Sequence, residues 1–228
     1  MNAEHTFNEW RFEVRWILLA FAGLIASVPL AGALTVAITL IVRITGANEN
    51  ILDKFDFGIV GIEISIGAMV GFIQWLALRR VIKTKISWVL ANVIGFAISS
   101  CIQTLATFVW KLPGDMVFPL GVLGLAIGFV VGGMLSGVMQ QRILRHHVRH
   151  SGWWVPASTI GWGLGLIGFA TGFAILHPIM PKPPNLLINI AVLMGLLALG
   201  SVFYGIVTGW TLIWLLRQPT QQMPHTTT

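Results

Sequence analysis

Residues 186–216 read LLINIAVLMGLLALGSVFYGIVTGWTLIWLL, 31 residues without one Asp, Glu, Lys or Arg. A helix of about 20 apolar residues crosses a hydrocarbon core about 30 Å thick. This run is therefore long enough to span a membrane with a strong tilt, or to break at Gly200, Gly205 or Gly209. The run predicts a transmembrane helix, and with it an integral membrane protein.

Five further apolar runs have the length of a membrane span. They occupy residues 16–42, 57–78, 86–110, 116–139 and 153–176. We therefore expect an all-α, polytopic transmembrane bundle of about six spans. In this scheme residues 1–15 form a cytoplasmic N-terminal segment, residues 16–217 a single transmembrane domain, and residues 218–228 a cytoplasmic tail.

The few charged residues sit between the apolar runs. Only 10% of the 228 residues are charged, against about a quarter in a soluble domain. Basic residues are more numerous on one side of the predicted spans, which places both termini in the cytoplasm. This distribution explains the net charge of +6 without a nucleic-acid partner. The more basic side carries Arg11, Arg15, Arg79, Arg80, Lys83, Lys85, Arg142, Arg145, Arg149 and Arg217, and the other side Arg43, Lys54, Lys111 and Lys182.

An ordered pattern recurs three times along the chain. Gln74 and Gln140 are 66 residues apart, and Gln140 and Thr208 are 68 apart. The simplest interpretation is three related helical hairpins, in which Gly67, Gly71, Gly133, Gly137 and Gly205 allow close helix packing and the amides bond across helices. The alternative is that Gly-rich spans with interfacial Trp resemble one another by chance. The matching elements are Trp16/Gly23, Trp88/Gly95 and Trp154/Gly161 in the odd spans, and Gly67/Gly71/Gln74, Gly133/Gly137/Gln140 and Ser201/Gly205/Thr208 in the even spans.

Two Trp-rich stretches carry a resemblance to a known group of proteins. Residues 153–162, WWVPASTIGW, and residues 205–219, which contain GIVTGW and WLLRQP, resemble Trp- and Gly-rich polytopic membrane proteins of photosynthetic bacteria. The resemblance covers nearly all the spans. It implies a bacterial inner (plasma) or thylakoid membrane, and it transfers no catalytic residue.

Glu63 is the one acidic residue inside a predicted span. An intramembrane carboxylate is costly and commonly marks a pathway or relay. Glu63 shares a helix face with Gly67, Gly71 and Gln74, so it should point into the bundle. The two other copies of the repeat place Phe129 and Leu197 at this position. The alternative is a structural ion pair near the outer interface, with Arg43, Lys54 or Lys111.

A polar stripe on the third span accompanies this carboxylate. Asn92, Ser99, Gln103 and Thr107 follow one another at intervals of seven, four and four residues. Two interpretations stay open: the stripe lines a polar cavity with Glu63, or it makes interhelical hydrogen bonds only. The ligand or transport candidates are therefore Glu63, Gln74, Asn92, Ser99, Gln103 and Gln140.

Little in the sequence indicates catalysis, a metal or a cofactor. His146, His147 and His150 lie among arginines without acidic or thiolate company, which disfavours a metal site. His177 stands alone as a candidate axial ligand, so a pigment is weakly supported. Phosphate loops, zinc-protease motifs and nucleophile elbows do not occur. We expect no enzyme and no cofactor.

The sequence leaves two functional hypotheses. The first is a non-enzymatic subunit or scaffold of a larger membrane assembly, which binds helices, lipids or pigments and has other membrane subunits as partners. The second is a small-solute transporter, or the ligand-binding subunit of one, with Glu63 in a polar cavity.

Overall fold

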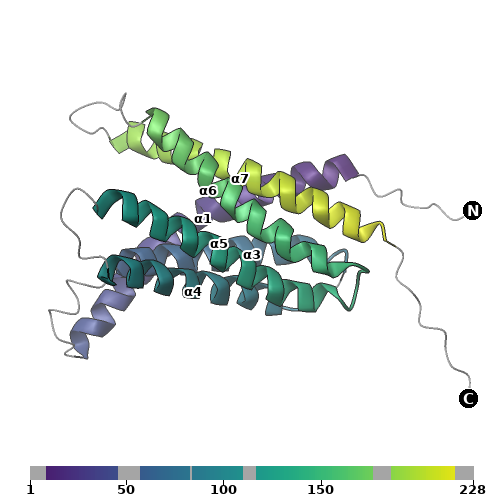
Figure 1. The fold of residues 1–228 in the computed structure, drawn as a ribbon, viewed down its shortest axis with the longest axis horizontal. Coiled ribbons are helices and arrows are strands. Elements are labelled where there is room, and N and C mark those ends of the chain that lie inside the picture. Colours follow the sequence, from purple (N-terminus) through teal and green to yellow (C-terminus); the bar gives the residue numbers. More distant parts are fainter. Residues whose placement is uncertain (1–8, 46–56, 83, 110–116, 177–185, 219–228) are drawn as a thin grey trace, which may run out of the picture.

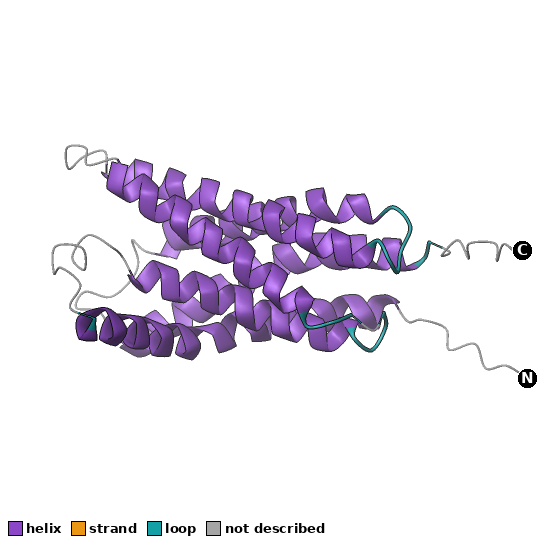
Figure 2. Cartoon of the chain, turned by 90° about the horizontal axis from the view of Figure 1, so that it is seen from below, coloured by secondary structure: helices purple, strands orange, loops and turns teal. Residues whose placement is uncertain are grey.

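The computed structural model describes residues 9–45, 57–82, 84–109, 117–176 and 186–218. Throughout these residues every regular element is helical (Figure 2). The long helices are α1 (Glu9–Ile44), α3 (Phe57–Leu78), α4 (Ser87–Val109), α5 (Val117–Leu144), α6 (Trp154–Leu176) and α7 (Leu186–Leu216), and a short 3-10 turn, η1 (Ser151–Trp153), precedes α6.

Six helices are long and apolar enough to cross a membrane, so the all-α six-span bundle is confirmed. Helices α3 and α7 begin and end at the residues that the apolar runs predict. Helix α1 begins before residue 16, and α5 runs on past residue 139 to Leu144. The predicted spans end before charged residues such as Arg15 and Arg142, because only apolar residues were counted. The helices continue through these residues, since Arg and Glu are good helix formers outside lipid.

The six helices form a ring in chain order. Consecutive helices pack as the hairpins α1/α3, α4/α5 and α6/α7, and α3 packs on α4 as α5 packs on α6. The first helix, α1, also packs on the last, α7, which closes the ring. The start of α1 and the end of α7 lie at the same end of the bundle.

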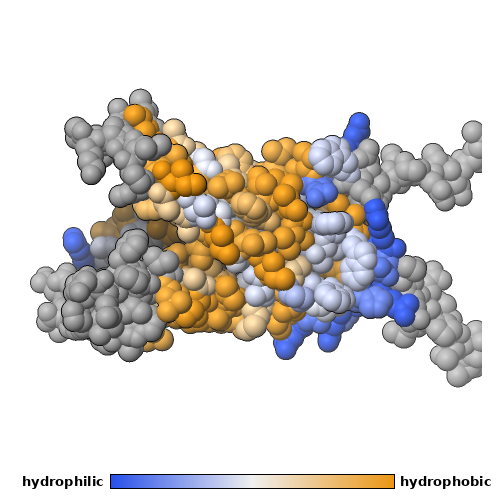
Figure 3. Space-filling model, turned by 45° about the horizontal axis from the view of Figure 1, so that its top comes forward, coloured by the Kyte–Doolittle hydropathy of each residue, from blue (hydrophilic) through white to orange (hydrophobic). Residues whose placement is uncertain are grey.

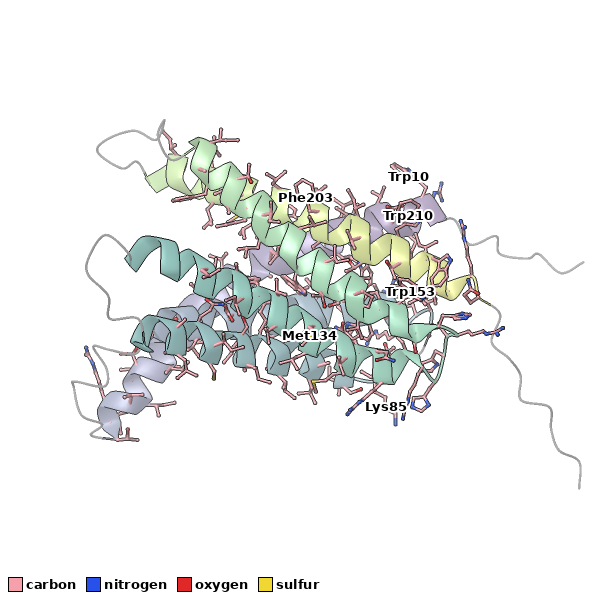
Figure 4. The ribbon with its side chains drawn as sticks, in the orientation of Figure 1. Trp10, Lys85, Met134, Trp153, Phe203 and Trp210 are labelled. Atoms are coloured by element: carbon pink, nitrogen blue, oxygen red, sulfur yellow. The ribbon has the colours of Figure 1, made fainter. Side chains whose placement is uncertain are left out.

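On the face that Figure 3 draws, the described residues form an apolar band and a hydrophilic end. Figure 3 shows apolar residues around the middle of the bundle and hydrophilic residues gathered at the end where α1 begins. This end, called the basic end below, carries Arg79, Arg145 and Arg217 among others. Three exposed tryptophans, Trp10, Trp153 and Trp210, lie toward it (Figure 4). Such a girdle is typical of a lipid–water interface.

Glycines bring neighbouring helices into backbone contact. A Cβ atom added to Gly95 would lie 2.7 Å from the carbonyl oxygen of Gly132 on α5. One added to Gly23 would lie 2.9 Å from Cα of Val70 on α3. Atoms at these distances clash, so the α1/α3 and α4/α5 hairpins depend on glycine at these points.

The glycines at the candidate packing positions also contact neighbouring helices. The nearest atoms to an added Cβ belong to Asn92 for Gly67 and Gly71, to Trp162 for Gly133, to Ser158 for Gly137 and to Ile17 for Gly205. In each case the neighbour lies on a helix of an adjacent hairpin. These five glycines therefore join one hairpin to the next, and Gly205 joins the last hairpin to the first.

Helices α1 and α7 meet near the basic end and separate away from it. Gly205 contacts Ile17, and Gly209 contacts Trp16. Farther along the same two helices, a Cβ added to Gly32 or Gly195 would meet no atom within 4 Å. Figure 1 shows the end of α1 and the start of α7 on opposite sides of the bundle. The ring is thus closed at the basic end and open between α1 and α7 at the far end.

Candidate functional site

Three indole hydrogen bonds tie the ring together. Trp88 Nε1 donates to Gln74 Oε1 at 3.3 Å, and Trp154 Nε1 donates to Gln140 Oε1 at 2.7 Å. Trp16 Nε1 donates to Thr208 Oγ1 at 3.0 Å. Each bond joins the first helix of a hairpin to the second helix of the preceding hairpin, counted around the ring. These are the Trp and the amide or hydroxyl positions of the sequence repeat.

The same tryptophans form a buried plug toward the basic end. Trp16, Trp88 and Trp154 are at most 1% exposed, although Trp in membrane proteins favours the lipid interface. These three side chains therefore do not face lipid, and each indole N–H finds an acceptor inside the ring. The plug also contains Leu78, Leu144, Val148, Leu212 and Leu215. It fills the core between the basic end and the space described next.

A cavity of about 720 Å³ lies on the far side of the plug. All six helices contribute to its wall, which is almost entirely apolar. Small-molecule sites in proteins commonly occupy 300–1,000 Å³ and are mostly apolar with a few polar groups. The described lining residues are Ala20, Leu24, Ser27, Val28, Ala31, Gly32, Thr35, Val36, Ile62, Glu63, Ile66, Val70, Gln103, Leu125, Phe129, Trp162, Gly165, Leu166, Phe169, Leu193, Leu196, Leu197, Gly200 and Tyr204.

The cavity reaches the lipid-facing surface between α1 and α7. Val36 on α1 and Leu193 on α7 both line it, and their side chains are 59% and 36% exposed. Gly32, which also lines it, has open space beside its Cα. A molecule dissolved in the bilayer therefore has lateral access to the cavity without crossing the plug.

Glu63 is the carboxylate in this wall. It is 2% exposed, and both of its carboxylate oxygens accept hydrogen bonds from α4. Ser100 Oγ donates to Oε2 at 3.0 Å, and Gln103 Nε2 donates to Oε1. Gln103 Nε2 also donates to Ser99 Oγ at 3.1 Å. The carboxylate is thus held in one orientation by neutral donors.

The structure offers this carboxylate no cation among the residues it describes. Arg43, one of the three predicted ion-pair partners, is exposed, and no ion pair joins it to Glu63. The other two, Lys54 and Lys111, lie outside the described residues.

The remaining polar candidates lie between helices rather than in the cavity wall. Gln74, Asn92, Ser99 and Gln140 are at most 1% exposed and are absent from the described lining. Gln74 Nε2 donates to Tyr204 Oη at 2.8 Å, and Asn92 Nδ2 donates to the Trp88 carbonyl at 3.1 Å. Of the two interpretations of the polar stripe, the structure favours helix contacts for Asn92 and Ser99, which lie against glycines of neighbouring helices. Glu63 and Gln103 do line the cavity, but the rest of its wall is mostly apolar. The side chain of Thr107 lies outside the described part of the chain.

Three residues of the site were not predicted from the sequence. Ser100 bonds Glu63, Tyr204 accepts a bond from Gln74, and Trp162 lies in the aromatic wall of the cavity. The ring centroid of Trp162 lies 4.5 Å from those of Phe96 and Tyr204. Two features of the sequence could have indicated Ser100 and Tyr204: the adjacent hydroxyls of Ser99 and Ser100, and the fact that the chain has a single Tyr.

None of the described histidine side chains lines the cavity. His146 and His150 are exposed at the basic end, and His177 lies outside the described residues. Over the ranges that the structure describes, no group of three His, Cys, Asp or Glu side chains is placed to hold a metal.

Comparison with known protein families, with curated proteins and with solved structures finds no match to this chain. The resemblance to Trp- and Gly-rich membrane proteins of photosynthetic bacteria therefore stays a prediction, and so does the bacterial origin that it implies.

Proposed function

We propose that this chain is a non-enzymatic membrane protein that binds an apolar molecule of the bilayer inside its helix ring. The observation that carries the proposal is the cavity of about 720 Å³ with its opening between α1 and α7. An apolar cavity stays dry, whereas hydrocarbon chains surround its mouth in a membrane. A lipid chain or a slender pigment is the matching occupant.

The size of the cavity argues against a partner helix as the occupant. A transmembrane helix of 20 residues, about 10 Å wide and about 30 Å long, fills about 2,400 Å³. The cavity offers about 720 Å³. Along α1 it runs from Ala20 to Val36, about 24 Å at about 1.5 Å per residue. A long and narrow molecule fits these dimensions better than a helix.

The polar groups around the cavity support binding rather than catalysis. Ser27 Oγ donates to the Leu24 carbonyl at 2.6 Å, so this hydroxyl already bonds its own helix. Among the described lining residues Glu63 is the only carboxylate, and no His or Cys accompanies it. A general acid or base acts with further polar groups positioned at the reacting atoms. The wall instead provides one carboxylate, held by Gln103, in a mostly apolar surface.

Two glycines supply a matched test of binding in the cavity. Gly32 lines the cavity, Gly195 does not, and neither has an atom within 4 Å of an added Cβ. We expect Gly32→Leu to lose a co-purifying lipid or pigment that the natural protein and Gly195→Leu retain. Native mass spectrometry after purification in mild detergent measures the occupancy. Equal occupancy in all three proteins would contradict the proposal.

We further propose that the three hairpins are copies of one ancestral unit in a bacterial inner or thylakoid membrane, with both termini cytoplasmic. Support for the repeat comes from the equivalent bonds of Trp16, Trp88 and Trp154. Leu78, Leu144 and Leu212, which follow the repeated amides and hydroxyl, are all buried in the plug. A place in a larger assembly stays a prediction, and mass spectrometry of stoichiometric protein partners in the same preparation tests it.

A transport role is the second candidate, and the position of Glu63 in the cavity wall favours it. Because the plug of Trp16, Trp88 and Trp154 lies between the cavity and the basic end, transport requires the plug to open. Movement of a fluorescent phospholipid between the leaflets of proteoliposomes tests this role. If the protein does not accelerate this movement relative to protein-free vesicles, transport is contradicted and binding is the remaining function.

A further inference from the structure

The cavity combines a hydrocarbon-like wall with one acidic group that no described cation accompanies, and this combination selects a ligand class. Glu63 lies in the wall together with Gln103, whereas Phe129 and Leu197 line the same cavity at the equivalent positions of the other hairpins. Two of the three equivalent positions are therefore apolar. The single carboxylate marks one place along the cavity for a polar head group.

Among the residues that the structure describes, the groups that bond Glu63 are neutral, and none of them is a cation. Ser100 and Gln103 each donate to one carboxylate oxygen, and both donors are neutral. None of the lining residues that the structure describes is Lys, Arg or His. A carboxylate removed from water is costly unless a cation accompanies it. A ligand that carries a cation would supply the partner that the described part of the wall lacks.

We propose that the occupant is an amphiphile with a hydrocarbon chain and a protonated amine, whose ammonium group pairs with Glu63. The proposal rests on the proposed binding function and names the substrate class of the same cavity. The ligand enters between α1 and α7, its chain lies along the apolar wall, and its ammonium donates hydrogen bonds to the carboxylate oxygens. An anionic head group would meet repulsion at this point, and an alcohol would gain a hydrogen bond without the charge attraction.

Three probes with the same chain and different head groups test the inference: hexadecylamine, hexadecanol and hexadecanoate. Apparent affinities are measured from ligand-induced thermal stabilisation of the purified protein. We expect hexadecylamine to bind at least about tenfold more tightly than hexadecanol, because an ionic hydrogen bond is stronger than a neutral one. Hexadecanoate should bind most weakly. Equal affinities of the amine and the alcohol would overturn the inference.

Two carboxylate variants then locate the selectivity. Glu63→Gln keeps the size of the side chain and should make hexadecylamine and hexadecanol equivalent. Glu13→Gln removes an acid of α1 that lies near Gly209 and outside the described lining, so the preference for the amine should persist. Retention of the preference in a folded Glu63→Gln protein would overturn the inference. If Glu63→Gln fails to fold, the head-group series on the natural protein still decides.

The failures of the two proposals are distinguishable. If none of the three probes stabilises the protein and Gly32→Leu retains the same bound molecules as Gly195→Leu, the binding function itself is contradicted. If hexadecanol binds as well as hexadecylamine and Gly32→Leu abolishes both, the cavity binds apolar molecules and only the selection of an amine is wrong.

Discussion

The indole Nε1 of Trp16 donates a hydrogen bond to Oγ1 of Thr208 at 3.0 Å, which joins the first helix to the last. The Trp88–Gln74 and Trp154–Gln140 bonds join helices that follow one another in the chain. A connecting loop therefore brings the helices together in those two pairs, whereas side-chain contacts hold α1 to α7. The mouth of the cavity lies along this same α1/α7 seam.

Replacement of these tryptophans by Phe should destabilise the protein unequally. In Trp154→Phe, Gln140 Oε1 loses its donor, and Gln140 Nε2 already has no hydrogen-bond partner in the described structure. A buried group left unsatisfied costs about 1–3 kcal/mol. In Trp16→Phe, the Thr208 hydroxyl keeps its bond to the Tyr204 carbonyl at 2.7 Å. We expect the midpoint of thermal unfolding to fall further for Trp154→Phe, and the reverse order would contradict the assigned bonds.

Glycine contacts predict a graded series of Ala variants. Gly95→Ala brings Cβ to 2.7 Å from a backbone oxygen, so α4 and α5 must move apart at a cost of about 1–3 kcal/mol. In Gly161→Ala the nearest atoms, at 3.1 Å, belong to the side chains of Thr208 and Tyr204, so the cost should be smaller. Gly195→Ala meets nothing within 4 Å and should gain up to about 1 kcal/mol from helix propensity. Thermal unfolding in one detergent ranks the three variants.

The number and position of the membrane helices were predictable from sequence because the length of an uncharged apolar run is a sufficient physical criterion. Helices α3 and α7 illustrate this, since their ends coincide with the ends of the runs. The burial of Glu63 was also predictable from the sequence, because its helix face carries the packing glycines Gly67 and Gly71.

The cavity was not predictable, because it depends on which helix faces meet across the ring. Its wall combines Ala31 of α1 with Leu193 of α7, and no local pattern relates these residues. The hydrogen-bond partners of the repeated tryptophans, in contrast, could have been predicted from the sequence. Trp88 and Gln74 recur as Trp154 and Gln140 with the same separation, as a conserved contact between repeats would require. Burial of an indole N–H then demands an acceptor of this kind.

The excess of basic residues at one end of the bundle predicts the orientation of the protein in the membrane. Arg149 is exposed at the basic end, and Thr45 is exposed at the far end. Because the natural chain has a single cysteine, Cys101, the test variants Arg149→Cys and Thr45→Cys are made in a Cys101→Ser background. We expect an impermeant maleimide to label Arg149→Cys in inverted bacterial vesicles and Thr45→Cys in intact spheroplasts. The opposite pattern would place both termini outside.

The hydrogen bond from Gln103 to Glu63 predicts a strong energetic coupling between these residues. Gln103→Leu leaves Oε1 of Glu63 without its donor, although Ser100 still donates to Oε2. A buried polar group that loses its hydrogen bond costs about 1–3 kcal/mol. The same change in a Glu63→Leu background removes no bond to a carboxylate, so it should cost much less.

A double-mutant cycle measures this coupling from the free energies of unfolding of Gln103→Leu, Glu63→Leu and the double variant. We expect a coupling of at least about 1 kcal/mol, within the range of residues in direct contact. A control cycle pairs Gln103→Leu with Thr211→Val, whose hydroxyl bonds the Val207 carbonyl of its own helix, and should give additive effects. Additivity in the Gln103/Glu63 cycle would mean that Gln103 does not hold the carboxylate. The acidic contact proposed for the amine would then be held by Ser100 alone.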